Sequence, residues 1–512
     1  MRCLLEFPIK YDIFYMLGGV MKVLLTTLNT KYVHTNIALK YLYETIKNKE
    51  NIEAELKEFT INEPVDKIFR NIAMQNADIV AFSVYIWNVE QTLVICENLK
   101  QLLPNIKIIL GGPEVTYCSK ELLEKYDFID YIIIGEGEET FPKLINGEIN
   151  SNVSYKQDDE IIVGTIGIVE DTKNIPCIAN EIVKEYDGKI VYIETVRGCP
   201  YNCSYCLSST IKGIRPFEME RVKNELLILM KAQVRLIKFV DRTFNYDKKR
   251  ALEIWKFILE NNISSEFHFE ISAHLIDEEM LNFLETVPKG VFRLEIGVQS
   301  TNEETIKAIN RKTDFKVLSD VTKKIASYKN IPMHLDLIAG LPYEGYERFK
   351  ESFNDVYNLN PNELQLGFLK LLKGCQITSE KDKYNYKYTT MPPYEVLENI
   401  FISFNELMEL KQTEEMLDIY YNQGRYKKTL NMVVQKFETP FDFYYEISAY
   451  AKENGYMDRK ISAEEWFDVL AKFYNEKGFD DFEMFIENLR KDHFENFGNK
   501  RRRGLFMFQK EY

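Results

Sequence analysis

The chain has 512 residues, a length that suggests about three domains. Hydrophobic residues make up 45% and charged residues 28%, the balance of a globular protein. The net charge of −14 argues against a general nucleic-acid binder, because affinity for phosphate rests on a basic surface. One basic run, at residues 500–503, is interpreted as the solvated end of a helix. No apolar run approaches the roughly 20 residues that span a bilayer, so no membrane partner is expected.

The first twenty residues lack the long apolar core of a signal peptide. Met21 leads directly into an apolar stretch, whereas Gly18, Gly19 and Val20 could be the translation of a purine-rich ribosome-binding sequence. We therefore expect Met21 to be the natural start and residues 1–20 to be a misassigned extension.

Residues 21–150 alternate short apolar runs with amphipathic stretches such as 36–47. This alternation predicts βαβ units with a parallel sheet covered on both faces, and hence a doubly wound, flavodoxin-like domain. Ligands in that architecture bind beyond the carboxyl ends of the strands. Residues 151–185 are irregular and are expected to be a linker or small sheet. The strands expected in the first domain are 22–27, 78–84, 106–110 and 131–134.

A second βα series occupies residues 186–375 and predicts a partial (β/α)6 barrel of the TIM type. Chemistry in such barrels gathers at the carboxyl ends of the strands. Residues 376–512 have helical spacing and many aromatics, which predicts an all-α domain with Trp466, Phe467, Phe473 and Tyr474 in its core. The expected strands are 190–195, 236–240, 266–271, 291–297, 333–338 and 363–368. The expected C-terminal helices are 394–410, 441–453, 463–477 and 482–491.

Three of the eight cysteines, Cys199, Cys203 and Cys206, lie in a C-x-x-x-C-x-x-C segment directly after the first expected barrel strand. Such clustering in a long chain indicates metal binding in a reducing, cytoplasmic compartment rather than a disulfide scaffold. Thiolates are the usual ligands of iron–sulfur clusters, and three of them leave one iron of a four-iron cluster open. A zinc site is the alternative, but it would want a fourth ligand, and the next histidine, His268, is distant in sequence.

With Tyr205 in its aromatic position, this segment resembles the signature of the radical S-adenosylmethionine (SAM) superfamily. The resemblance implies that the three cysteines hold a [4Fe–4S] cluster and that SAM chelates its open iron. It further implies reductive cleavage of SAM to a 5′-deoxyadenosyl radical, with a one-electron donor such as a flavodoxin or a ferredoxin as partner.

Short motifs that follow in chain order resemble the family's later strand ends, at 239–245, 269–273, 294–300, 310–311 and 336–342. A carboxylate at such a strand end is a sound acceptor for ribose hydroxyls, and an arginine can pair with a carboxylate. The residues to which the resemblance assigns SAM binding are Tyr205, Asp241, Glu270, Ser272, Glu295, Gln299, Arg311 and Asp336.

The first domain is similar to the cobalamin-binding domain that precedes many radical SAM enzymes, through the motifs at 83–85, 111–114 and 135–140. Its D-x-H-x-x-G motif is absent: His34 lacks the Asp and the Gly, so we interpret it as a surface or capping histidine. A fold that has lost its cofactor is the alternative. The residues that the resemblance assigns to cobalamin are Ser83, Gly111, Gly112, Glu114, Gly135 and Glu136.

Together these features predict a cobalamin-dependent radical enzyme that methylates an unreactive carbon of a small-molecule or peptide substrate. One alternative is a radical cyclase, an oxidase or a methylthiotransferase-type enzyme without methyl transfer from cobalt. Another is an iron–sulfur redox sensor without turnover. Neither the substrate nor a catalytic side chain is readable from the residues.

Overall fold

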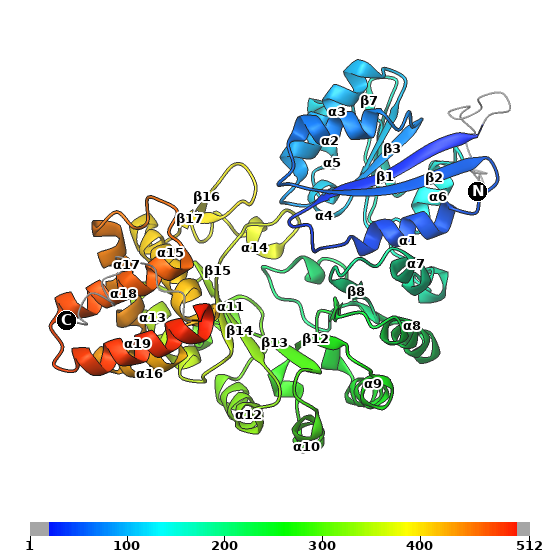
Figure 1. Ribbon diagram of the computed structural model, residues 1–512. Coiled ribbons are helices and arrows are strands. Elements are labelled where there is room, and N and C mark those ends of the chain that lie inside the picture. Colours follow the sequence, from blue (N-terminus) through cyan, green and yellow to red (C-terminus); the bar gives the residue numbers. More distant parts are fainter. Residues whose placement is uncertain (1–19, 499–512) are drawn as a thin grey trace.

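The computed structural model describes residues 20–498. The expected N-terminal extension, apart from Val20, and the basic run at 500–503 lie outside these residues. Figure 1 shows the N-terminal sheet above a second sheet, with the C-terminal helices beside the second sheet. None of the described helices is long and apolar enough to cross a membrane.

The N-terminal sheet has the strand order β2-β1-β3-β4-β5-β6-β7. Its first five strands are parallel and follow the 2-1-3-4-5 order of flavodoxin-like folds, which confirms the expected architecture. The strands are β1 (Met21–Asn29), β2 (Ile52–Thr60), β3 (Ile79–Ser83), β4 (Lys107–Gly111), β5 (Tyr131–Ile133), β6 (Val153–Gln157) and β7 (Glu160–Ile162).

Three strands of this sheet lie outside the four expected for the first domain. The edge strand β2 carries Glu53, Glu55 and Lys57 at alternate positions, so its charges hide the apolar half of the pattern. Strands β6 and β7 are antiparallel and extend the sheet beyond β5, so this part of the expected linker belongs to the first domain.

Helices cover both faces of the N-terminal sheet. One face packs against α1 and α6 through residues such as Leu39 and Phe141, and the other packs against α2, α3 and α5. The loops at the carboxyl ends of the strands remain open toward the second domain. The helices are α1 (Ile37–Ile46), α2 (Val65–Ala73), α3 (Val89–Leu102), α4 (Pro113–Thr116), α5 (Ser119–Lys125), α6 (Thr140–Leu144) and, before the second sheet, α7 (Ala179–Lys184).

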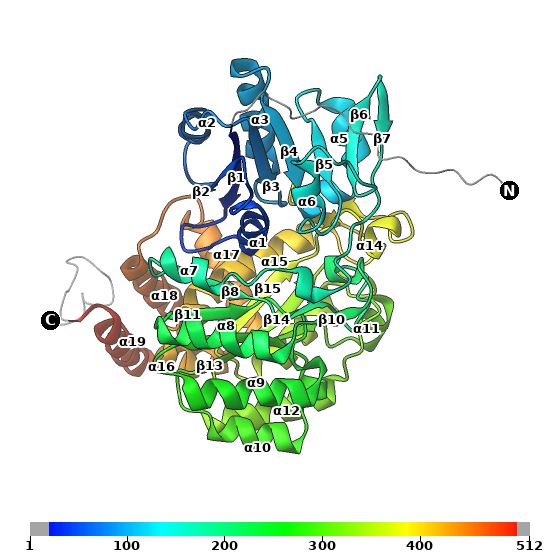
Figure 2. The ribbon, with the colours of Figure 1, turned by 90° about the vertical axis from the view of Figure 1, so that its right-hand side faces the viewer.

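The second sheet contains six parallel strands in the order β15-β14-β13-β12-β11-β8, which confirms the expected partial barrel. Helices α8, α9, α10 and α12 line its outer side (Figures 1 and 2). The strands are β8 (Val191–Ile193), β11 (Leu236–Phe239), β12 (Glu266–Ile271), β13 (Phe292–Gln299), β14 (Met333–Ala339) and β15 (Glu363–Phe368). The helices are α8 (Met219–Lys231), α9 (Lys248–Asn261), α10 (Glu278–Thr286), α11 (Glu303–Ala308), α12 (Phe315–Tyr328) and α13 (Tyr346–Tyr357).

The C-terminal region is helical but contains a small hairpin, which corrects the expected all-α domain. Residues 396–398 of the expected helix 394–410 form strand β17, and the helix begins at Phe404, where Ser403 and Glu406 form a capping box. The expected core residues Trp466, Phe467, Phe473 and Tyr474 are buried. The elements are α14 (Gln376–Ser379), β16 (Lys387–Tyr388), β17 (Val396–Glu398), α15 (Phe404–Leu417), α16 (Lys427–Val433), α17 (Pro440–Glu453), α18 (Ala463–Lys477) and α19 (Phe482–Phe497).

Candidate functional site

Two cavities open at the carboxyl ends of the two sheets. The first, of about 480 Å³, lies between α1, the ends of β3 to β5 and the segment 194–215 of the second domain. The second, of about 240 Å³, lies over the ends of β12, β13 and β14. The loop that carries the three cysteines separates them, because its flanking residues Gly198 and Leu207 line the first cavity and the cysteines line the second.

Backbone geometry fixes the start of the cysteine loop. The short strands β9 (Val196–Gly198) and β10 (Ile214–Pro216) pair antiparallel and close the loop between them. Gly198 has a φ of 88°, and a Cβ at this position would lie 1.9 Å from the carbonyl oxygen of Gly213. Only glycine satisfies this approach, so the residue before the first cysteine sets where the loop leaves the sheet.

The three thiols face the second cavity together with side chains from three strands. Arg311 holds this wall: its guanidinium donates to the Tyr205 hydroxyl at 3.1 Å, to the Gly297 carbonyl at 2.5 Å and to the Cys203 sulfur at 3.9 Å. Burial raises the pKa of the Cys203 thiol, while the positive charge of Arg311 opposes that shift. Arg311 therefore favours the thiolate that an iron–sulfur cluster requires.

Glu295 is held as a carboxylate in the same cavity. Burial alone would raise its pKa, but a 2.8 Å hydrogen bond with His268 and an ion pair of 3.1 Å with Lys238 lower that pKa to about 2. A permanently charged acceptor at the end of β13 suits paired hydroxyl donors such as those of a ribose.

Two further side chains of the second cavity are free to meet a ligand. Gln299 has a φ of 73°, and its buried Oε1 has no hydrogen-bond partner among the described residues. Burial raises the pKa of Glu270, which accepts no side-chain hydrogen bond within the described part of the chain. Buried polar atoms without partners are costly unless a ligand satisfies them, so this cavity fits a polar cofactor such as SAM.

The structure brings together seven of the eight residues expected to bind SAM and leaves out one. Asp241 does not line the cavity: its carboxylate is fully buried and accepts hydrogen bonds from the backbone N–H groups of Thr195 at 2.7 Å and Val196 at 3.3 Å, as well as from the Thr195 hydroxyl. Its role is to cap the end of β8. The seven that line the cavity are Tyr205, Glu270, Ser272, Glu295, Gln299, Arg311 and Asp336.

A hydrogen-bonded chain in this cavity escaped the sequence reasoning. The His274 ring bonds the Tyr201 hydroxyl at 2.8 Å through Nε2 and the Ser272 hydroxyl at 2.9 Å through Nδ1. Tyr201 lies inside the cysteine loop and His274 directly follows the third strand-end motif, so their positions beside recognised motifs were the available signal.

Across residues 20–498, no group of three His, Cys, Asp or Glu converges as a site for a single metal ion. The cysteines instead spread along one cavity wall. A four-iron cluster bound by three thiolates uses each of them on a different iron, so a spread arrangement fits it.

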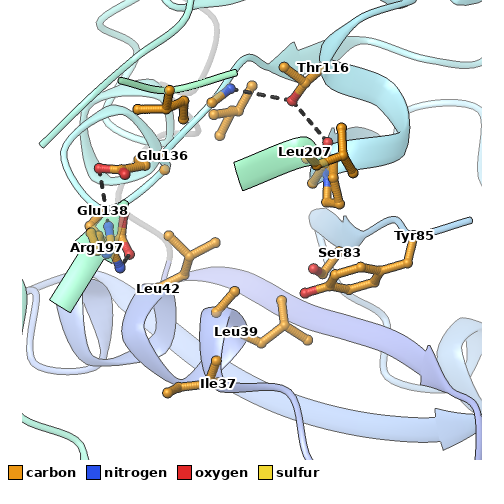
Figure 3. A pocket seen from close by; sticks show the side chains of 18 of the residues that line it. Ile37, Leu39, Leu42, Ser83, Tyr85, Thr116, Glu136, Glu138, Arg197 and Leu207 are labelled. Atoms are coloured by element: carbon orange, nitrogen blue, oxygen red, sulfur yellow. Dashed lines mark hydrogen bonds and ion pairs between the residues drawn. The ribbon is translucent and has the colours of Figure 1, made fainter. Parts of the chain in front are cut away.

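The first cavity combines apolar and acidic walls (Figure 3). Ile37, Leu39 and Leu42 of α1 form one side, and Tyr85 lies opposite Glu138. Gly112 and Gly135, two of the lining residues expected to bind cobalamin, pack closely against the backbone of another segment. A Cβ on Gly112, whose φ is 110°, would lie 2.5 Å from the Val84 carbonyl oxygen.

Three carboxylates of the first cavity share two arginines. Arg197 pairs with Glu138 at 2.5 Å, with Glu194 at 3.1 Å and with Glu136 at 3.2 Å, and Arg215 binds Glu136 at 2.6 Å. Burial opposes ionisation of Glu136, but its two arginines lower its pKa overall. Burial raises the pKa of Glu194 to about 7, and the negative charge of Glu138 adds to this shift while Arg197 opposes it.

Glu114 and His34 are not among the residues that line this cavity. The buried Glu114 carboxylate accepts hydrogen bonds from Lys373 at 2.7 Å and from the Tyr394 hydroxyl at 2.5 Å, so it joins the two domains instead of binding a cofactor. The His34 ring forms a hydrogen bond with the Tyr192 hydroxyl at 2.7 Å and is not among the residues that line the cavity. The expected residues that do line the cavity are Ser83, Gly111, Gly112, Gly135 and Glu136.

The cavity nevertheless fits a corrinoid by its donor set. The buried Glu138 Oε2 and Arg215 Nε atoms have no hydrogen-bond partner among the described residues, and both residues line the cavity. A flat macrocycle with polar amide arms could use the apolar floor of α1 and these polar atoms together. The described residues that line the cavity include no histidine, so cobalt would bind here without an imidazole ligand.

The class of protein is indicated by the combination of a doubly wound domain with a partial barrel that carries a three-cysteine loop. Residues 23–145 match the B12 binding domain family, and residues 193–356 match the radical SAM superfamily. Residues 382–512 match a family described as a protein of unknown function, DUF4080. The chain is thus a radical SAM protein with a B12-binding domain, homologous to cobalamin-dependent radical SAM methyltransferases.

Among curated relatives, TokK of Streptomyces tokunonensis, a cobalamin-dependent radical SAM methyltransferase, is 25% identical over 354 residues, 62% of this chain and 50% of TokK. The anaerobic magnesium-protoporphyrin IX monomethyl ester cyclase of Synechocystis is 29% identical over 236 residues, 42% of this chain and 46% of the cyclase. The chain therefore spans about half the length of these relatives.

Solved structures share the fold. The cobalamin-dependent radical enzyme OxsB with aqua-cobalamin and SAM bound has a TM-score of 0.65 at 16% identity, covering 94% of this chain and 84% of OxsB. The methyltransferase TsrM of Kitasatospora setae with cobalamin and a [4Fe–4S] cluster bound has a TM-score of 0.62 at 14% identity, covering 85% of this chain and 99% of TsrM.

Proposed function

We propose that this protein is a cobalamin-dependent radical SAM enzyme that transfers a methyl group to an unreactive carbon of a small-molecule substrate. The observation that carries the proposal is the wall shared by the two cavities: the cysteine loop borders both. A substrate between them can meet both cofactors without leaving the protein.

In this proposal Cys199, Cys203 and Cys206 hold the cluster, and the lining of the second cavity orients SAM. The chemistry supplied by the bound groups is radical generation from SAM and methyl donation from cobalamin. Arg311 keeps Cys203 disposed to ionise, and the carboxylate of Glu295 orients hydroxyl donors. Around the first cavity, α1 supplies an apolar surface that excludes water.

A radical cyclase is the second candidate, because the Synechocystis relative is named as a cyclase and is 29% identical. Both activities would use the second cavity in the same way. They differ in whether a methyl group passes through the first cavity. The relatives named as methyltransferases, TokK among them, favour methyl transfer.

We further propose that the protein works in the cytoplasm with a flavodoxin or ferredoxin as electron donor. The described cysteines are all free thiols, which suits a reducing compartment. An open-site cluster needs one electron for each cleavage of SAM, and small redox proteins supply electrons of that kind.

The test is anaerobic reconstitution with iron and sulfide, followed by hydroxocobalamin, reductant and SAM with a deuterated methyl group. The proposal expects retained corrinoid, 5′-deoxyadenosine and deuterium-labelled methylcobalamin by mass spectrometry. Formation of 5′-deoxyadenosine by protein that retains no corrinoid would favour the cyclase candidate. Absence of 5′-deoxyadenosine from protein with a full cluster would refute both.

A further inference from the structure

Among the residues that the structure describes, Arg242 alone lines both cavities. It follows β11, one residue beyond the buried Asp241 that anchors this strand end to β8. The anchored backbone places the long guanidinium side chain at the junction, and the side chain is exposed there.

Among the described cations that line the first cavity, Arg242 is the one that forms no ion pair with a carboxylate. The three carboxylates of the first cavity are paired with Arg197 and Arg215, whereas no hydrogen bond or ion pair within 4 Å joins the side chain of Arg242 to any described residue. Glu270 in the second cavity feels its positive charge, but the two form no ion pair.

Under the proposed function, the substrate lies at the junction of the two cavities. A carbon that must meet reactive groups in both cavities lies between them, next to the one side chain common to both linings. A free guanidinium in that place is a specific receptor for a carboxylate, which it can grip with two parallel N–H···O bonds.

We propose that the substrate carries a carboxylate and that Arg242 binds it at the junction of the two cavities. This inference rests on the proposed function. A single negative charge suits the site better than a phosphate dianion, because Glu136, Glu138 and Glu270 line the surrounding walls and repel additional charge.

The test measures binding without turnover. Protein carrying its cluster, hydroxocobalamin and SAM is titrated anaerobically by calorimetry with benzoate and, separately, with the isosteric neutral amide benzamide. We expect benzoate to bind about tenfold more tightly or better, because a charge-assisted bidentate contact is lost in the amide. Arg242→Gln should abolish the preference, and Arg242→Lys should retain part of it.

Lys249→Gln is the matched control, since Lys249 is an exposed cation that lines neither cavity. This variant should keep the preference for benzoate. Equal affinity for the two probes, no binding of either, or a preserved preference in Arg242→Gln overturns the proposal. So does a parallel loss of SAM affinity in Arg242→Gln, which would place this arginine in the cofactor site.

The outcome is separable from that of the proposed function. If benzoate selectivity depends on Arg242 but no labelled methylcobalamin forms, the anion site stands and methyl transfer fails. If methylcobalamin forms and selectivity is absent, methyl transfer stands and the carboxylate assignment fails.

Discussion

The two cavities hold buried carboxylates in opposite ways. In the second cavity Glu295 has a hydrogen bond with His268 and an ion pair with Lys238, and its pKa falls to about 2. In the first cavity Glu194 shares Arg197 with Glu136 and Glu138, and its pKa rises to about 7. The second cavity therefore contains a carboxylate with a fixed charge, whereas the first combines an apolar surface with an ion-pair network in which several carboxylates share two arginines.

The largest effect is expected from removing one of the three cysteines that line the second cavity. Cys203→Ala should abolish cluster binding and 5′-deoxyadenosine formation, because two thiolates cannot hold the four-iron cluster. Iron content and chromatography of the reaction products are the measurements. Cys177→Ala, at an exposed thiol away from both cavities, should keep both properties. Normal iron content in Cys203→Ala would contradict the assignment.

The fixed charge of Glu295 gives the next largest effect. Glu295→Gln should weaken SAM binding about 10- to 100-fold, because hydrogen bonds to a charged acceptor contribute about 1.5–3 kcal/mol. Equilibrium dialysis of labelled SAM with cluster-loaded protein measures the change. Glu266→Gln is the control: Glu266, on the neighbouring strand β12, pairs with Arg293 outside the cavity. Equal losses in both variants would mean that the effect is not local.

Glu194 makes the first cavity sensitive to pH. Because its folded pKa is about 7 against an ordinary value of 4.5, the folded state binds the extra proton between these values, and stability is lost as pH rises through that window. Between about pH 5 and pH 7 the wild-type free energy of unfolding should fall by about 1–2 kcal/mol more than that of Glu194→Gln. Denaturant unfolding at several pH values measures this difference, and parallel pH profiles would count against it.

The smallest expected effect concerns the contact that holds the two domains together. Tyr394→Phe removes one of the two hydrogen bonds to Glu114 and leaves that of Lys373 in place. It should lower the free energy of unfolding by about 1 kcal/mol. Tyr445→Phe, at a partly exposed ring, should leave it unchanged when both variants are unfolded in urea. A neutral Tyr394→Phe would show that Lys373 alone secures Glu114.

Local patterns were enough to predict both sheets. The strands of the barrel recur where apolar runs end at polar turns, and two of the six, β12 and β15, have the predicted bounds. The C-x-x-x-C-x-x-C loop is equally local, since its spacing lies within eight residues. Patterns failed where a strand is half exposed, as in β2, or where residues such as 396–398 join a hairpin despite their helical spacing.

The sequence by itself determined the fold class, the cysteine loop and most of the side chains at the strand ends, because these depend on residues close together in the chain. Only the tertiary structure decided what those side chains meet. Glu114 accepts a hydrogen bond from Lys373, 259 positions away, and Asp241 accepts one from the backbone at the end of β8. The position of Arg242 beside both cavities depends on how the two domains pack together, and no local sequence pattern predicts it.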